Sequence, residues 1–156
     1  METIYLVGQI SPKFKETYLW RKRVTEKLMG RFNIINPCSN PFNKNALKEK
    51  EYAVSENGRE YGIDLLVPKD FTYVQRSSIA IVNMNHYDLD KPLLGSFFEL
   101  AWYYTFPEKT VIAFTKNLND YQCQHPFVQK SVNTWCHDEE QACYLVEKYF
   151  TCVEGC

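Results

Sequence analysis

The chain has 156 residues, of which 45% are hydrophobic and 15% aromatic, so a folded core is expected and disorder is not. This length favours a single domain over residues 1–156. The formal net charge of −1 gives no electrostatic reason to expect binding to a nucleic acid polymer or to an anionic membrane.

The N-terminal segment lacks the basic and long apolar regions of a signal peptide, and no apolar stretch approaches the roughly 20 residues of a membrane span. We therefore expect a soluble, cytoplasmic protein. The six cysteines form no C-x-x-C pair, which favours free thiols over disulfides. A zinc site built from Cys136, His137, Cys143 and His125 would match no common ligand spacing, and no metal or organic cofactor is expected.

Short apolar stretches alternate along the chain with amphipathic ones. The first half predicts a strand at 4–7, a helix at 15–29, a strand at 32–35, a loop at 37–45 and a charged helix or flap at 46–60. The second half predicts a short helix at 70–76, a strand at 79–84, a helix at 95–104, a strand at 110–114, a short strand at 132–135 and a closing helix at 138–150. Strands that alternate with helices indicate an α/β fold with a parallel sheet.

Two of these helices indicate which face they bury. In the helix at 15–29, Trp20, Val24 and Leu28 are spaced four apart and therefore lie on one face. In the closing helix, Asp138 is a plausible N-cap. The residues of that helix expected to face inward are Ala142, Leu145, Val146 and Tyr149.

Glu99 is the most informative residue, because it is a carboxylate within an otherwise apolar stretch that runs from Leu94 to Trp102. The preceding Gly95 and Ser96 place it in the first turn of a helix that follows a buried strand. In open α/β sheets, ligands bind beyond the carboxyl ends of the strands. Since burying a charge is costly, Glu99 either interacts with the helix dipole or serves a site.

Other polar residues are expected at the same edge of the sheet. The first strand contributes Tyr5, Gly8 and Gln9, and the loop before the strand at 79–84 contributes Asp70. The loop after that strand contributes Asn85. Purely structural interpretations remain open: Tyr5 as an ordinary strand tyrosine, Asp70 as a helix cap and Gly8 as a turn residue.

The segments Ile4–Gln9, Pro68–Asp70 and Gly95–Ala101 together resemble the nucleoside 2-deoxyribosyltransferase family, whose relatives include the nucleoside 5′-monophosphate N-glycosidases. The resemblance covers most of residues 3–150. It implies a flavodoxin-like fold, with a parallel sheet of about five strands flanked by helices. It also implies cleavage of the N-glycosidic bond of (2′-deoxy)nucleosides, with transfer of the deoxyribosyl group to another nucleobase.

The resemblance implies roles for three residues. Glu99 matches the nucleophile that forms a covalent glycosyl-enzyme ester, as in retaining glycosidases. Tyr5 matches the tyrosine that holds this carboxylate in position. Asp70 matches the aspartate that protonates the leaving base as a general acid.

Two departures from the family bear on the substrate. Leu93 stands where many members carry an aspartate that contacts the sugar hydroxyls, and Ser77–Ser78 stands where members often have Ser-Asp. Meanwhile Ser96, with Gly95 at a helix start, is a candidate phosphate ligand, to which Arg21 and Ser11 are expected to add. The alternative for Arg21 is a surface helix arginine.

Three functions therefore stay open. They are base exchange between deoxynucleosides, hydrolysis of a nucleoside 5′-monophosphate to free base and sugar phosphate, and nucleotide binding without turnover. Base exchange would need aromatic walls around an acceptor base, for which the candidates are Trp20, Phe42, Phe71 and Tyr73. Core packing is the alternative for each of these four side chains.

The expected partners are a small-molecule nucleoside or nucleotide and further copies of this chain. The resemblance implies a homo-oligomer, a dimer or larger, in which a neighbouring subunit completes the site. The segment Cys123–Gln129 lies where that contribution would come from, so His125 either faces a neighbour's cleft or makes a local hydrogen bond.

Overall fold

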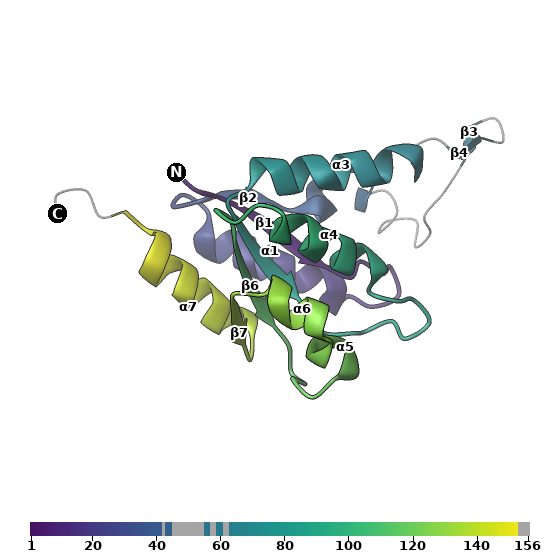
Figure 1. The fold of residues 1–156 in the computed structure, drawn as a ribbon. Helices are drawn as coiled ribbons and strands as arrows, with labels where there is room; N and C mark the ends of the chain where they lie inside the picture. The colour runs from purple at the N-terminus through teal and green to yellow at the C-terminus, as the bar shows by residue number, and fades with distance from the viewer. Residues whose placement is uncertain (42, 45–54, 57–58, 61–62, 153–156) are drawn as a thin grey trace.

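The computed structural model describes residues 1–41, 43–44, 55–56, 59–60 and 63–152 (Figure 1). The strands of the main sheet are β1 (Thr3–Gly8), β2 (Asn33–Ile35), β5 (Ile79–Asn83), β6 (Thr110–Phe114) and β7 (Thr134–Cys136). The helices are α1 (Glu16–Leu28), α3 (Ile63–Arg76), α4 (Leu94–Tyr104), α5 (Tyr121–Gln124), α6 (Pro126–Ser131) and α7 (Glu139–Phe150), with a 3-10 turn at Pro37–Ser39.

The five strands form one parallel sheet in the order β2-β1-β5-β6-β7. This is the strand order of flavodoxin-like proteins, so the predicted α/β fold is confirmed. The chain moves outward from β1 to β2 in one direction and then crosses to β5 on the other side of β1. The direction therefore reverses between β1 and β5, and a crevice is expected beyond the carboxyl ends of these two strands.

Helices cover both faces of the sheet, as Figure 1 shows. On one face, Ile4, Leu6 and Ile81 pack with side chains of α1 and α7. On the other face, Tyr5 and Val82 pack with side chains of α3, α4 and α6. Successive residues of β1 thus alternate between two separate apolar clusters, which is why its run is hydrophobic throughout.

The predicted packing of α1 is confirmed, since Trp20, Val24 and Leu28 are all buried. For α7, the predicted cap is also confirmed, because the Asp138 side chain accepts a hydrogen bond from the Gln141 amide at 2.8 Å. Ala142 and Val146 are fully buried, and Leu145 packs beside them. Tyr149 was expected to face inward and is instead 67% exposed, because Phe150 packs against the cluster at this end of the helix.

Several predicted boundaries are wrong. Asp70 lies inside α3, which begins at Ile63 rather than at residue 70, so Asp70 neither caps a helix nor lies in a loop. Glu99 lies in the second turn of α4, whose first turn has no acidic residue. The dipole interpretation of Glu99 therefore loses its basis, since that effect is confined to the first turn.

Some segments differ from the sequence-based expectation in kind. The short helices α5 and α6 were not predicted. Most of 46–60 lies outside the described residues, and its described parts are β3 (Ser55–Glu56) and β4 (Arg59–Glu60), which pair antiparallel. Within the described ranges, no helix combines the length and apolar character needed to cross a membrane.

Candidate active site

Glu99 of α4 and Tyr5 of β1 are in contact. Tyr5 is in the middle of β1, and its side chain points toward α3 and α4. Its hydroxyl donates a hydrogen bond to Oε1 of Glu99. Glu99 is 7% exposed and Tyr5 is 1% exposed, so a carboxyl group is held inside the protein by a phenol. A buried carboxyl group needs such a partner because desolvation penalises its charged form.

A cavity of about 200 Å³ opens beside this pair at the point where the strand order reverses. It brings together eight of the nine predicted site residues, which are Tyr5, Gly8, Gln9, Arg21, Asp70, Gly95, Ser96 and Glu99. Sequence analysis missed other residues of its lining, among them Asn43, Leu66, Lys69 and Lys91. The site thus contains two carboxyl groups, a phenol and three cationic side chains.

Asn85 is the predicted site residue that does not line this cavity. Its side chain donates to Oδ1 of Asn83 at 2.8 Å and accepts from the backbone amide of Lys116 at 2.9 Å. These bonds join the loops that follow β5 and β6. The structure therefore places Asn85 between two loops rather than among the residues that surround the cavity.

Burial controls the ionisation of the two carboxyl groups. Burial and, to a smaller extent, the neighbouring charge of Asp70 together raise the pKa of Glu99 to about 8, against the hydrogen bond from Tyr5, which lowers it. Burial also raises the pKa of Asp70, while Lys69 lowers it. The pKa of Tyr5 lies well above its usual value because of burial and of Glu99, so its hydroxyl remains a donor.

Gly8 lets β1 approach the end of β5 closely. Its φ is +154°, and a Cβ atom there would lie 3.0 Å from the carbonyl oxygen of Asn83. Any larger residue would push the two strands apart where the cavity begins. Gly8 thus shapes the cavity through its backbone.

Arg21 is fully buried, so the alternative of a surface helix arginine is wrong. Its guanidinium donates to the backbone carbonyls of Leu6, Gly8, Gln9 and Thr17. These bonds fix the loop between β1 and α1 at one side of the cavity. A role for Arg21 in substrate binding stays a prediction, but most of its donors already have backbone partners.

Gln9 has a similar structural task. Its Nε2 donates to the carbonyls of Asp88 and Lys91, each at 3.0 Å. Its Oε1 accepts from the amides of Tyr87 and Asp88 at 3.1 and 2.8 Å. The whole amide is therefore used in holding the loop between β5 and α4, which carries Lys91 to the cavity.

The predicted aromatic walls lie elsewhere in the described part of the chain. Trp20 is buried on the opposite face of the sheet, in the cluster with α1 and α7. Phe71 packs edge-on against Trp102 with ring centroids 5.2 Å apart, and Tyr73 packs against Tyr5 at 5.4 Å. None of these three lines the cavity, and Phe42 lies outside the described residues.

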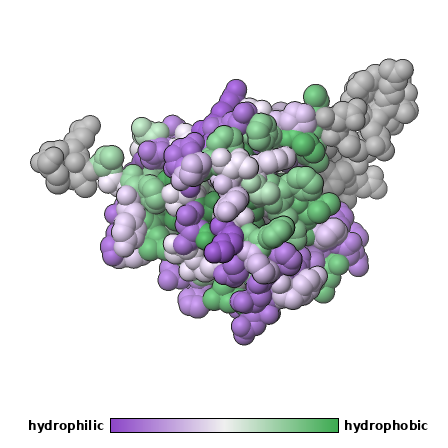
Figure 2. Space-filling model, viewed as in Figure 1, coloured by the Kyte–Doolittle hydropathy of each residue, from purple (hydrophilic) through white to green (hydrophobic). Residues whose placement is uncertain are grey.

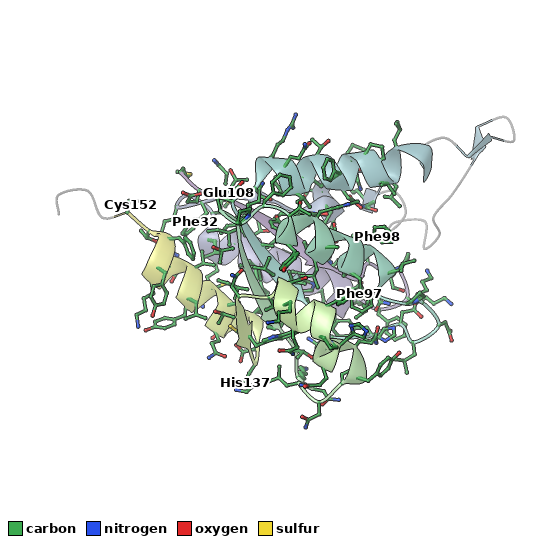
Figure 3. The ribbon with its side chains drawn as sticks, viewed as in Figure 1. Phe32, Phe97, Phe98, Glu108, His137 and Cys152 are labelled. Atoms are coloured by element: carbon green, nitrogen blue, oxygen red, sulfur yellow. The ribbon has the colours of Figure 1, made fainter. Side chains whose placement is uncertain are left out.

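His125 makes a local hydrogen bond, which was one of its two predicted alternatives. Its Nδ1 accepts from the amide of Phe127 at 3.3 Å and so caps α6. His125 and His137 were also considered as zinc ligands. In the described ranges, no group of three or more His, Cys, Asp or Glu side chains is placed to hold a metal ion. Figure 3 shows His137 beside the end of β7.

No protein-family model and no curated protein sequence matches the chain. Solved structures do resemble it. A 2-deoxyribosyltransferase from Leishmania mexicana has a TM-score of 0.64 at 14% identity, covering 96% of this chain and 100% of that one. A 2-deoxyribosyltransferase from Bacillus psychrosaccharolyticus has a TM-score of 0.61 at 17% identity, covering 90% and 89%.

A conserved protein from Enterococcus faecalis V583 has a TM-score of 0.63 at 11% identity, covering 95% of this chain and 98% of that one. At these identities the likeness concerns the backbone, and it extends over nearly the whole length of all three chains. The chain therefore has the fold of the 2-deoxyribosyltransferases.

Proposed function

We propose that this protein cleaves the N-glycosidic bond of (2′-deoxy)nucleosides and transfers the deoxyribosyl group to another nucleobase through a covalent intermediate on Glu99. The observation that carries the proposal is a buried Glu99 hydrogen-bonded to Tyr5 in a cavity that also contains Asp70. The fold shared with two 2-deoxyribosyltransferases supports it.

The proposed chemistry divides the tasks between two carboxyl groups. A Glu99 oxygen attacks C1′ of the sugar while the C1′–N bond breaks, and the bonding electrons go to the base. Asp70 gives the departing base a proton. A second base then attacks C1′ from the opposite side, returns a proton to Asp70 and releases Glu99, so that the configuration at C1′ is retained.

Glu99 and Asp70 can take these two roles if they share one proton. Burial and mutual repulsion oppose a state in which both are charged. With a single proton between them, the reactive arrangement has Glu99 ionised and Asp70 protonated. Tyr5 favours that arrangement, because its hydroxyl stabilises the charged form of Glu99.

Incubation with deoxyinosine and adenine, followed by chromatography, tests the proposal. Formation of deoxyadenosine is expected, and a 2′-fluoro substrate analogue should leave a sugar adduct that peptide mass spectrometry locates on Glu99. An adduct on another residue would contradict the assignment. Binding of the analogue without any base release would instead indicate a nucleotide-binding module.

A second candidate is hydrolysis of a nucleoside 5′-monophosphate, favoured by the start of α4. Ser96 is 4% exposed and lines the cavity, and among the described residues its hydroxyl has no hydrogen-bond partner. The helix has no side-chain cap and no acidic residue in its first turn, so its amide groups favour an anion. Lys91 adds a positive charge to the same lining.

Replacing Ser96 with alanine separates the two substrates. If a phosphate binds here, the KM for a nucleoside 5′-monophosphate should rise about tenfold or more, since a hydrogen bond to a charged group is lost. The KM for the unphosphorylated nucleoside should stay unchanged in the same variant. Steady-state kinetics with both substrates measure the two KM values. Equal changes in KM for the two substrates would show that the phosphate does not bind at Ser96.

The proposed homo-oligomer has support on the surface beside α4 and α6. A groove of about 490 Å³ lies there, bordered by Phe97, Tyr121 and Phe127. Phe127 is 80% exposed, and Figure 2 shows hydrophobic residues gathered over α4, where Figure 3 places Phe97 and Phe98. Large exposed aromatic side chains are enriched in subunit interfaces.

Replacing Phe127 with aspartate should therefore dissociate the oligomer. A buried, unpaired charge in an interface costs several kcal/mol, so a clear fall in molar mass is expected by light scattering. Tyr149→Asp is the matched control, because Tyr149 is also exposed but lies on α7, away from this groove. A wild-type protein that is already monomeric, or a Phe127 variant of unchanged mass, would contradict the proposed interface.

A further inference from the structure

Lys69 and Asp70 are neighbours in α3 that turn toward each other. Adjacent residues on a helix point about 100° apart and do not normally face one another. Here Nζ of Lys69 lies 3.1 Å from Oδ1 of Asp70, and both residues line the cavity that contains Glu99. The Lys69 side chain is 18% exposed. This ion pair is therefore formed inside the site and largely out of solvent, where charges interact more strongly than at a surface.

Aromatic contacts hold the lysine in this place. Its Nζ lies 5.7 Å from the centre of the Tyr73 ring, which favours a cation. The Tyr73 ring packs edge-on against Tyr5, and its hydroxyl accepts a hydrogen bond from Asn40 at 3.2 Å. Since Tyr5 in turn donates to Glu99, one continuous set of contacts connects Lys69 with both carboxyl groups.

The acidic side chains of the cavity need a nearby cation. Burial alone favours the neutral forms of Asp70 and Glu99, and in that state neither is a nucleophile. Two cations oppose this effect, Arg21 and Lys69. Arg21 is occupied by backbone carbonyls, whereas Lys69 touches a carboxylate directly. The titratable and charged groups around Lys69 are Asp70 and Tyr73 on its own helix, Tyr5 on β1, Glu99 on α4, Arg21 on α1, Cys38 in the 3-10 turn and Lys91 in the loop before α4.

We propose that Lys69 is a positioning residue that keeps the Asp70–Glu99 pair at one negative charge. One carboxyl group is then ionised for attack on the sugar, while the other keeps the proton that the leaving base requires. This inference rests on the proposed function for its chemical meaning. The effect of Lys69 on the charge of the pair is a separate property, which the protein shows with or without turnover.

The test compares wild type with Lys69→Met, which keeps the apolar stem, and Lys69→Arg, which keeps the charge. Carbon-13 NMR of carboxyl-labelled protein follows the Glu99 titration, with Glu99→Gln used to assign the signal. In Lys69→Met the Glu99 midpoint should rise above that of wild type, because a cation that lowers it is lost from the cavity that both residues line. Lys69→Arg should keep the midpoint close to that of wild type.

The pH profile of base release provides a second readout that a merely structural role would not move. In Lys69→Met the rising limb should shift upward with the titration, so that activity is lost near neutral pH and recovers at high pH. An unchanged Glu99 midpoint, or an equal fractional loss at every pH, would overturn the proposal. If Lys69→Met does not fold, Lys69→Gln replaces it in both measurements.

The two proposals fail in different ways. If wild type releases no base from any nucleoside or monophosphate, the proposed function is wrong, and the NMR titration still decides whether Lys69 controls the charge of the pair. If base is released but the titration is the same in Lys69→Met and wild type, Lys69 has no such role and the proposed function stands.

Discussion

Glu99→Gln is expected to abolish turnover and, in the same variant, to make the protein more stable at neutral pH. The amide keeps the shape of the side chain, and its oxygen still accepts the hydrogen bond from Tyr5. It is not a nucleophile, so the rate of base release should fall by at least about 10³-fold. Stability should change in the opposite direction, because the wild-type carboxyl group is held where its charge is costly.

The pH dependence of this gain follows from the pKa of Glu99. Below pH 4.5, its usual pKa, the carboxyl group is protonated in both the folded and the unfolded chain, so wild type and variant should differ little. As the pH rises toward about 8, the unfolded chain releases this proton and the folded protein retains it, which favours unfolding of wild type. The variant has no carboxyl group at this position, so its free energy of unfolding does not fall in this way. The difference amounts to about 3 kcal/mol at pH 7.

Urea unfolding of both proteins at pH 4.5 and pH 7 measures the difference. Glu108→Gln is the matched control, because Glu108 is an exposed glutamate at the opposite end of the sheet (Figure 3). It should leave both the activity and the stability unchanged. An equal gain for Glu99→Gln at both pH values would mean that burial does not raise the pKa of this group, and retained turnover would remove Glu99 from the chemistry.

The fold and the positions of Glu99 and Tyr5 were predictable because they depend on local patterns. An apolar run followed by a helix start places Glu99 beyond a strand, and topology then brings Tyr5 to the same edge. The limits of the helices were less predictable. A short helix was predicted at 70–76, whereas α3 begins at Ile63 and continues through Pro68, which has no amide hydrogen to offer residue 64.

The site features that sequence analysis missed depend on contacts between distant segments. Nothing local distinguishes Lys69 from the many surface lysines of the chain, and only the meeting of α3 with β1 and α4 encloses it. Gln9 and Arg21 were predicted to bind substrate because of their place after β1, and both line the cavity. The sequence did not show that their polar atoms also bond to backbone groups of the neighbouring loops. A sequence shows which residue carries a donor, but the fold decides which acceptor it reaches.

Asp70→Asn is expected to slow base release by about 10²–10⁴-fold with a natural nucleoside, since the leaving base loses its proton donor. A p-nitrophenyl deoxyriboside has a leaving group that departs as an anion, so its hydrolysis should fall far less. The ratio of the two losses measures the contribution of the acid. Lys91→Met serves as the control, because Lys91 lines the same cavity but has no proposed part in protonation of the base. Equal losses with both substrates in Asp70→Asn would show that this residue acts through structure alone.

The same variant also reports on the interaction between the two carboxyl groups. Burial is the largest cause of the raised pKa of Glu99 and remains in Asp70→Asn, but the repulsion from a charged Asp70 is removed. The pKa of Glu99 should therefore fall below about 8 and stay above its usual value. Attack on the sugar needs the ionised carboxylate, so with the activated substrate the rate should persist to lower pH than in wild type. If the rate rises with pH at the same midpoint in both proteins, Asp70 and Glu99 do not interact. That result would contradict the proposal that they share one proton.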